Sequence, residues 1–405
     1  MGNVKELKQQ NILEAIRILH KEKEVSKQEL ARLMEISTVS AHSFINELLE
    51  KGIVLSSGTG SSNHGRKATL YRLNPKYGFS VGIVLTSTSI ITVAYSFTSE
   101  LISSFSLGIE KIPDEALCEN MIAQARLAIA NHEKEYGICL GVGVAMPGII
   151  DHQTGLIKKI LHFPDFKTLD LKFVMQNALK VPVFVGNDNK VCMNALKWAG
   201  DQYTDVPVAF IGVEEGVGCG VMIGGQILQG ANSVAGEIGH LPIDPNGPLC
   251  SCGNRGCIEH YIAERELIEK IIQHLNQESD FPSRYTSENF TIQHVISLAR
   301  SNDFVRSAIR ECCDYFCILL ENVVKIYGPQ EIIIECEYLK QLPEFFSYLS
   351  DRFYRSPWVD GQSYSIRLNT IEYVYATGGA MTVLDNICTN PTDNLLLDFL
   401  ESTSA

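Results

Sequence analysis

The chain has 405 residues, of which 45% are hydrophobic and 20% charged, and its formal net charge is −13 at pH 7. This length predicts two or three domains, and with no apolar run near the roughly 20 residues that span a bilayer and no signal-peptide pattern, we expect a cytoplasmic protein without a membrane partner. The 12 cysteines are therefore expected as reduced thiols, which excludes a disulfide framework.

Charge is unevenly distributed along the chain. Residues 1–76, which we call the head, contain 12 Lys or Arg against 8 Glu, so the remainder has a net charge of −17. A mildly basic head on an acidic body favours a head that meets a polyanion, although so small an excess also arises by chance.

The first part of the head predicts two helices. Apolar residues recur at helical spacing over residues 11–20. Farther on, Ser26 is followed three residues later by Glu29, a capping-box pattern that opens a second helix. Its buried face should contain Leu30 and Leu33.

The rest of the head predicts a third helix and a β-hairpin. A turn at residues 34–37 precedes the amphipathic segment 38–51, whose buried face should contain Val39, Phe44, Ile45, Leu48 and Leu49. Two β-like runs then flank a Gly/Ser-rich loop, which is typical of a wing. This order predicts a winged helix-turn-helix that binds DNA, although any helical hairpin has the same periods.

Two kinds of side chain suit DNA contact. Small polar residues at the start of the third helix can reach base edges in a major groove, and basic residues in the wing can reach phosphates or the minor groove. The predicted DNA-binding residues are Thr38, Ser40, His42 and Ser43 on the helix, with Arg66 and Lys67 in the wing.

After the head, strands alternate with helices, which predicts an α/β body. We expect a strand pair over 77–97, a helix over 115–134, strands over 137–151 and 181–189, a hairpin over 208–228, helices from about 263 and a strand over 330–336. Asn187 and Asp188 stand at the C-terminal end of one strand, where open α/β sheets place ligands.

The segment "GEIGHLPIDPNGPLCSCGNRGCIEHY" at residues 236–261 gathers potential metal ligands. Cys250, Cys252 and Cys257 lie within eight residues, and His240 precedes the first by ten. Three thiolates and an imidazole form the closed tetrahedral set of structural zinc, with no position left for a catalytic water. Reduced buried cysteines without a metal, or a redox sensor, are the alternatives.

The same segment resembles the signature of the ROK family of repressors, open reading frames and sugar kinases. Glu237, Gly239 and His240 match its ExGH pattern, and residues 250–259 match its CxCGxxGCxE pattern. The stretches "GVGVAMPGIID", "NDN", "GRKATLYRLN" and "ATGGAMTVLD" extend the resemblance over nearly the whole chain. The run "DPNGPLCSCGNRGC" is most similar to the xylose-repressor branch.

The resemblance implies a two-lobed, actin-like (ribonuclease H-like) sugar kinase fold behind the winged head, with a sugar in the cleft between the lobes. Expected domains are 1–76 for the head, 77–190 with 380–405 for the first lobe, and 191–379 for the second. One ring nitrogen of His240 would bind zinc and the other the sugar. The implied sugar-binding residues are Asn187, Asp188, Glu237, His240 and Glu259.

Family kinases use an Asp base and Gly-rich phosphate loops, and here the loops are altered. In "VLTST" Val84 stands where the first loop has Asp, and Thr86 and Ser87 stand where it has glycines. The second loop reads "EEGVG", and the family's late Gly-Gly has become Glu335–Cys336. Carboxylates facing a triphosphate repel it, and β-branched side chains obstruct the approach of backbone to phosphate.

The altered loops beside an intact sugar set predict a sugar-responsive repressor of carbohydrate-utilisation genes rather than an enzyme. The alternative is an ATP-dependent sugar kinase with Asp188 as the base. Expected partners are operator DNA, a sugar or sugar phosphate, and further copies of the chain in a homodimer or homotetramer.

Overall fold

The structure is a computed structural model that describes residues 2–59, 68–110, 112–160, 163, 166, 170–198, 206–278, 285–287 and 289–389. The chain divides into two compact units. The first unit comprises Met1–Gln202 and Glu372–Ala405, and the second comprises Tyr203–Ile371. In the described part of the chain, no helix combines the length and the apolar character needed to cross a membrane.

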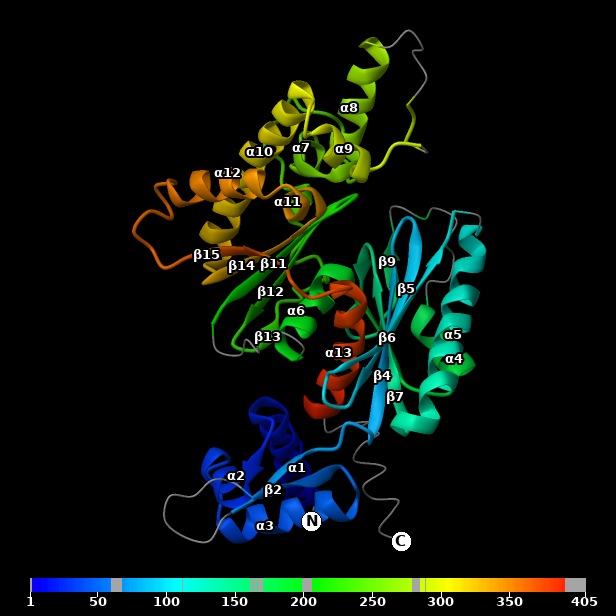
Figure 1. Cartoon of the computed structure of the whole chain (residues 1–405), viewed down its shortest axis with the longest axis vertical. Helices are drawn as coiled ribbons and strands as arrows, with labels where there is room; N and C mark the ends of the chain where they lie inside the picture. Colours follow the sequence, from blue (N-terminus) through cyan, green and yellow to red (C-terminus); the bar gives the residue numbers. More distant parts are fainter. Residues whose placement is uncertain are drawn as a thin grey trace. The chain divides into compact units, whose positions relative to one another are not determined.

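The head has the predicted helices and hairpin (Figure 1). Its elements are α1 (Gly2–Glu22), β1 (Val25–Ser26), α2 (Lys27–Leu33), α3 (Thr38–Glu50), β2 (Val54–Thr59) and β3 (Thr69–Leu73), and its sheet has the order β1-β3-β2. The Ser26 hydroxyl caps α2 by accepting a hydrogen bond from the Glu29 amide at 3.1 Å. Ser37 caps α3 in the same way, with Ser40 as donor.

The predicted buried face of α3 is wrong at Val39, and Leu49 on that face is half-buried. Val39 is 78% exposed, whereas Phe44, Ile45 and Leu48 are buried. At 100° per residue, Val39 lies far from Phe44 around the helix and shares a side with His42, three residues later. The exposed side of α3 therefore contains an apolar residue among polar ones.

The rest of the first unit is built on a five-stranded sheet in the order β10-β7-β4-β5-β6. Its strands are β4 (Gly78–Leu85), β5 (Ser89–Ser96), β6 (Leu101–Gly108), β7 (Ile138–Met146) and β10 (Val183–Asn187). The strands β4, β7 and β10 are parallel, and β5 and β6 extend the sheet as an antiparallel meander. A small ribbon of β8 (Ile149–Ile150) and β9 (Ile157–Lys159) follows β7.

Helices cover both faces of this sheet (Figure 1). α4 (Leu117–Tyr136) and α5 (Leu171–Leu179) lie on one face, and α13 (Val374–Thr389) lies on the other, packed against α6 (Asp188–Trp198). Glycine allows the close approach of α13, because a Cβ on Gly143 would lie 1.9 Å from the Gly379 carbonyl oxygen.

The second unit repeats the strand pattern of the first. Its sheet has the order β13-β12-β11-β14-β15, with β11 (Val208–Val213), β12 (Val217–Ile223), β13 (Gln226–Ile227), β14 (Glu331–Cys336) and β15 (Ser365–Leu368). An antiparallel meander is again continued by two parallel strands. The helices are α7 (Glu259–Ile262), α8 (Glu264–Glu278), α9 (Ile292–Leu298), α10 (Asp303–Tyr327), α11 (Glu337–Gln341) and α12 (Pro343–Tyr354).

The boundaries between the two units differ from the lobe boundaries that we expected. The chain leaves the first unit after Gln202 and returns at Glu372, rather than at 190 and 380. The reason is packing: α6 and α13 lie against each other and against the first sheet, so both belong to the first unit from end to end.

Candidate metal centre and ligand-binding residues

Backbone hydrogen bonds fold the segment that contains the cysteines. The Ile243 amide donates to the Gly256 carbonyl at 2.8 Å, and the Cys250 amide donates to the Asn254 carbonyl at 2.8 Å. Gly256 has a φ of +61°, and a Cβ there would lie 1.9 Å from the Asp244 carbonyl oxygen. Glycine at this position therefore lets the chain turn back, so that Cys250, Cys252 and Cys257 lie near His240.

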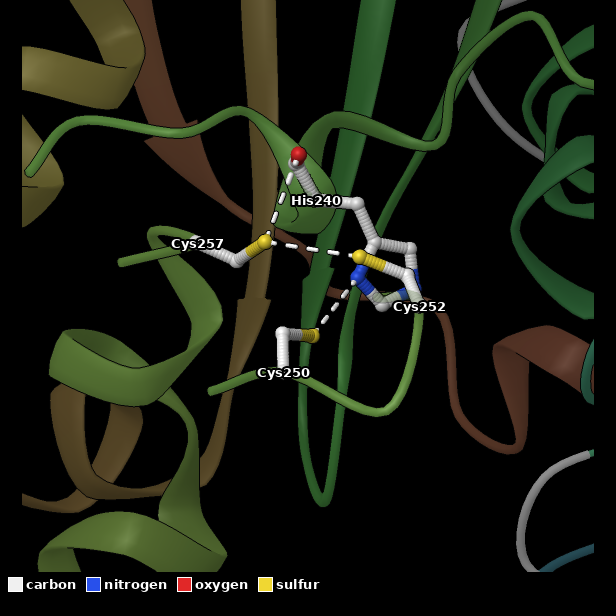
Figure 2. Close-up of side chains that lie close together, drawn as sticks. All are labelled: His240, Cys250, Cys252 and Cys257. Carbon is white, nitrogen blue, oxygen red and sulfur yellow. Dashed lines mark hydrogen bonds between the residues drawn. The ribbon is translucent and has the colours of Figure 1, made fainter. Parts of the chain in front are cut away.

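The four predicted metal ligands come together in the second unit (Figure 2). The Cys250 Sγ is 3.5 Å from His240 Nδ1, and the Sγ atoms of Cys252 and Cys257 are 3.6 Å apart. All four ligand atoms lie within 4.8 Å of one another. A tetrahedral zinc site with bonds of about 2.3 Å to sulfur places its sulfurs about 3.8 Å apart, so this set can hold such an ion.

The pKa values of the three thiols in this cluster are shifted in different directions. Burial raises the pKa of Cys250 and Cys257. Burial also acts on Cys252, but hydrogen bonds from the Asn254 backbone and from the neighbouring thiols lower its pKa overall. A metal would bind these residues as thiolates, so loading the site would release protons.

Glu259 and Glu237 flank the metal ligands. Glu259 is buried, with its side chain 11% exposed, and its Oε1 lies 3.5 Å from both His240 Nδ1 and Cys250 Sγ. Glu237 is half-buried and precedes the 3₁₀ turn Ile238–His240. Of the two ring nitrogens of His240, Nδ1 is the one that faces Cys250 and Glu259.

Asn187 and Asp188 stand where β10 passes into α6, in the first unit. The Asn187 Nδ2 donates to the Gly148 carbonyl at 3.0 Å, and its Oδ1 accepts from the Lys190 amide at 3.1 Å. The Asp188 Oδ1 accepts two hydrogen bonds from Asn189, at 2.7 and 2.9 Å. Burial outweighs these bonds and raises the pKa of Asp188 to about 6.

The predicted DNA-contacting side chains differ in exposure. Thr38, His42 and Ser43 are exposed, whereas Ser40 is half-buried and its hydroxyl lies 2.9 Å from the hydroxyl of Ser37. Arg66 and Lys67 lie outside the described residues. Val39 was not predicted to contact DNA, because the helical period placed it on the buried face of α3.

Lys27 was also missed, because its contacts come from tertiary structure. Its Nζ donates to Asn46 Oδ1 at 2.7 Å and lies 3.3 Å from His42 Nδ1, which places a positive charge from α2 beside the exposed side of α3. The sequence signal was a Lys at the start of the helix that precedes α3.

Comparison with known proteins identifies the family. The ROK family model matches residues 103–344, which is more than half of the chain. This chain belongs to the ROK family.

Among ROK proteins, the chain is 26% identical to the xylose repressor of Bacillus subtilis over 392 residues, which is 95% of this chain and 96% of the relative. It superimposes with a TM-score of 0.79 and 19% identity on a ROK family transcriptional regulator described as a homolog of the Escherichia coli MLC protein, covering 98% of this chain and all of that one. The glucokinase of Streptomyces griseus, solved with glucose and AMPPNP, gives a TM-score of 0.61 at 21% identity, covering 75% of this chain and 98% of that one. These likenesses confirm the predicted two-lobed fold behind a helical head.

In this ROK chain, the loop at the first phosphate position is a closed turn between β4 and β5. The Thr86 hydroxyl accepts from the Ser89 amide at 3.0 Å and lies 3.1 Å from the Ser89 carbonyl. Val84, in place of the kinase Asp, is 3% exposed. Its buried side chain offers no oxygen to a magnesium ion.

The second phosphate position is acidic. The Glu264 amide donates to the Glu214 carbonyl at 2.8 Å, which joins α8 to the turn between β11 and β12. Burial raises the pKa of Glu264 to about 8, and the carboxylates of Glu215, Glu335 and Glu337 act in the same direction. Glu264 is therefore largely protonated at neutral pH, and a nucleotide phosphate here would instead meet the carboxylates of Glu215 and Glu337, whose charge has the same sign as its own.

Proposed function

We propose that this chain is a sugar-responsive transcriptional repressor that binds operator DNA through the head and does not transfer phosphate. The observation that supports this most directly is the pair of altered phosphate positions, closed by Thr86 in one unit and acidic around Glu264 in the other. The head, residues 1–76, adds a function that phosphoryl transfer does not need.

We propose that the sugar is bound by Asn187, Asp188, Glu237, His240 and Glu259. Carboxylates, an amide and an imidazole can each pair with sugar hydroxyls, and buried polar groups discriminate strongly against a ligand that lacks the matching hydroxyl. Xylose is the first candidate, because the relative from Bacillus subtilis is named a xylose repressor.

We propose that His240, Cys250, Cys252 and Cys257 bind structural zinc. The ion would fix the ring of His240 and, next to it, the carboxylate of Glu259, so that both keep their orientation when the sugar binds. The closed ligand set leaves no water to activate.

DNA contact is proposed for Thr38, Val39, His42 and Ser43, with Lys27 beside them and with Ser40, Arg66 and Lys67 as predicted. Winged helix-turn-helix heads commonly read paired half-sites, which favours a homodimer.

A binding panel tests the function. Purified protein is heated with D-xylose, D-glucose, N-acetylglucosamine and their phosphates, and the ligand should raise the unfolding midpoint by mass action. Duplexes from the region upstream of the chain's own gene are then titrated by fluorescence anisotropy at stated salt, with and without that sugar. Failure to retain any duplex would reject the regulator.

A second candidate function, sugar phosphorylation, is favoured by Asp188 alone, because its raised pKa of about 6 suits a general base. A coupled assay with ATP and the same sugars tests it. If the wild type turns over ATP and Asp188→Asn does not, the chain is a sugar kinase and the repressor-only proposal is wrong. We expect no turnover above the level of the variant.

A further inference from the structure

One buried histidine of the head contacts two other parts of the first unit, in addition to the packing of α1 against α13. His20, on α1, is 5% exposed. Its ring packs edge-on against Trp198, with the ring centroids 4.8 Å apart, and its Nε2 lies 2.8 Å from the Ser99 hydroxyl. Trp198 ends α6, and Ser99 lies in the turn between β5 and β6, so two parts of the body contact one side chain of the head.

Trp198 is itself fixed in place. Its indole Nε1 donates to Asp385 Oδ1 at 2.8 Å, and Lys197 Nζ donates to the same oxygen at 2.6 Å. Asp385 lies on α13, so the end of α6 that contacts the head is bound to the helix that covers the sheet.

The opposite end of α6 begins at Asp188, a proposed sugar-binding residue. Between Asp188 and Trp198 the helix has 11 residues, which corresponds to about 16 Å. Asn194 Nδ2 donates to Thr382 Oγ1 at 2.9 Å, and a Cβ on Gly378 would lie 2.5 Å from the Val191 carbonyl oxygen. Such close packing leaves α6 and α13 no room to move separately, so they behave as one rigid body.

We propose that α6 and α13 carry the sugar signal to the DNA-binding head through the contact between Trp198 and His20. This inference rests on the proposed function. A sugar hydroxyl that pairs with Asp188 displaces the start of α6, and the rigid helix pair transfers the displacement to Trp198. Because α1 also packs against α2 and β3, a shift of His20 reorients the exposed side of α3.

The signal is a difference in free energy. Sugar binding changes DNA affinity only if the seating of His20 on Trp198 differs between the sugar-bound and sugar-free states. Removing this contact should therefore uncouple the two ligands while leaving each able to bind.

Fluorescence gives a direct test. The chain has two tryptophans, and Trp358 is 60% exposed in the second unit. In Trp358→Phe, Trp198 is the sole indole, and saturation with the panel sugar that stabilises the protein most should shift its emission. If that sugar lowers DNA affinity while the emission of Trp198 stays constant, the proposal is overturned.

Coupling measurements give a second test. The ratio of DNA affinities without and with the sugar, commonly about 5- to 150-fold in coupled systems, should fall below about twofold in Trp198→Leu and in His20→Gln. Both variants should still gain thermal stability from the sugar and bind the same duplex. Lys21→Ala, an exposed neighbour on α1, serves as the control and should keep the full ratio.

The outcomes separate the inference from the function on which it rests. Wild-type coupling that persists within twofold in both variants would overturn the route through Trp198. A wild-type protein that binds no panel sugar, or no duplex, would remove the proposed function and this inference together. If Trp198→Leu unfolds, His20→Gln and the single-tryptophan emission still decide the question.

Discussion

Cys257 is the candidate metal ligand with the least exposure, since its side chain is fully buried and its Sγ contacts both Cys252 Sγ and the His240 carbonyl. We expect Cys257→Ser to lose bound zinc, because a hydroxyl is a poor ligand for this ion. Loss of the metal should cost about 2 kcal/mol or more and lower the unfolding midpoint by roughly 4–8 °C.

Metal content by atomic emission and thermal unfolding together check this prediction. Cys388→Ser is the matched control, because Cys388 is 2% exposed and lies on α13 rather than in the cluster. Equal zinc in both variants would show that Cys257 is only a core residue.

Val39 is exposed beside polar residues that suit a DNA groove, and an apolar side chain there can contact the methyl group of thymine. Val39→Ala should weaken binding to a retained duplex roughly three- to tenfold while changing stability by less than about 0.5 kcal/mol. The same duplex with deoxyuridine for thymine should bind both proteins equally. A preference for thymine over deoxyuridine that survives in Val39→Ala contradicts this assignment. Leu127→Ala, at an exposed position of α4, is the control.

His20 makes stability depend on pH. Burial, aided by the nearby Lys23, lowers its pKa from 6.5 to about 3. Between these values the unfolded chain binds a proton that the folded chain does not, so this contribution to stability is complete above about pH 6.5 and is lost as pH falls. Urea unfolding at about pH 7.5 and about pH 5 should show a larger loss in wild type than in His20→Gln. Equal losses would mean that His20 titrates normally.

At the scale of elements, glycines set the distance between α13 and the sheet. A Cβ on Gly143 would meet the Gly379 carbonyl oxygen at 1.9 Å, whereas a Cβ on Gly108 has nothing within 4 Å. Gly143→Ala should therefore destabilise the protein by about 3 kcal/mol, measured by denaturant unfolding, and Gly108→Ala should be nearly neutral. A loss of the same size in both variants would show that the close approach of the Gly379 carbonyl is not its cause.

The sequence predicted the elements with a strong apolar signal and missed those without one. The strands β4, β7 and β11 are almost wholly buried and read as apolar runs. By contrast, β6 is largely exposed, so only pairing with β5 reveals it. The prediction for Val39 was wrong because this residue is the second of α3. At the start of a helix, fewer neighbouring apolar residues indicate which face is buried.

The sequence predicted those parts of the candidate site whose residues are close together in the chain. It did not predict contacts between residues that are far apart in the chain. His240 and the three cysteines lie within 18 residues, so their spacing alone indicated a metal. The contacts of His20 with Ser99 and Trp198 join residues far apart in the chain, and no periodicity predicts them. Long-range packing of this kind is decided by the whole fold.

At the scale of the whole molecule, the two ligands must affect each other equally. The head and the candidate sugar-binding residue Asp188 belong to one compact unit. We therefore expect the free energy of DNA binding to depend on whether the sugar is bound. If the sugar weakens DNA binding by a given factor, DNA must weaken sugar binding by the same factor.

Two titrations test this equality. DNA affinity is measured by anisotropy with and without saturating sugar, and sugar affinity by calorimetry with and without saturating duplex, all at one salt concentration because salt alters phosphate contacts. The two factors should agree within about twofold, and in Trp198→Leu both should fall toward unity together. A sugar that changes DNA affinity without the reciprocal change would mean that it acts on the oligomeric state, since the equality holds only when the number of associated chains is constant.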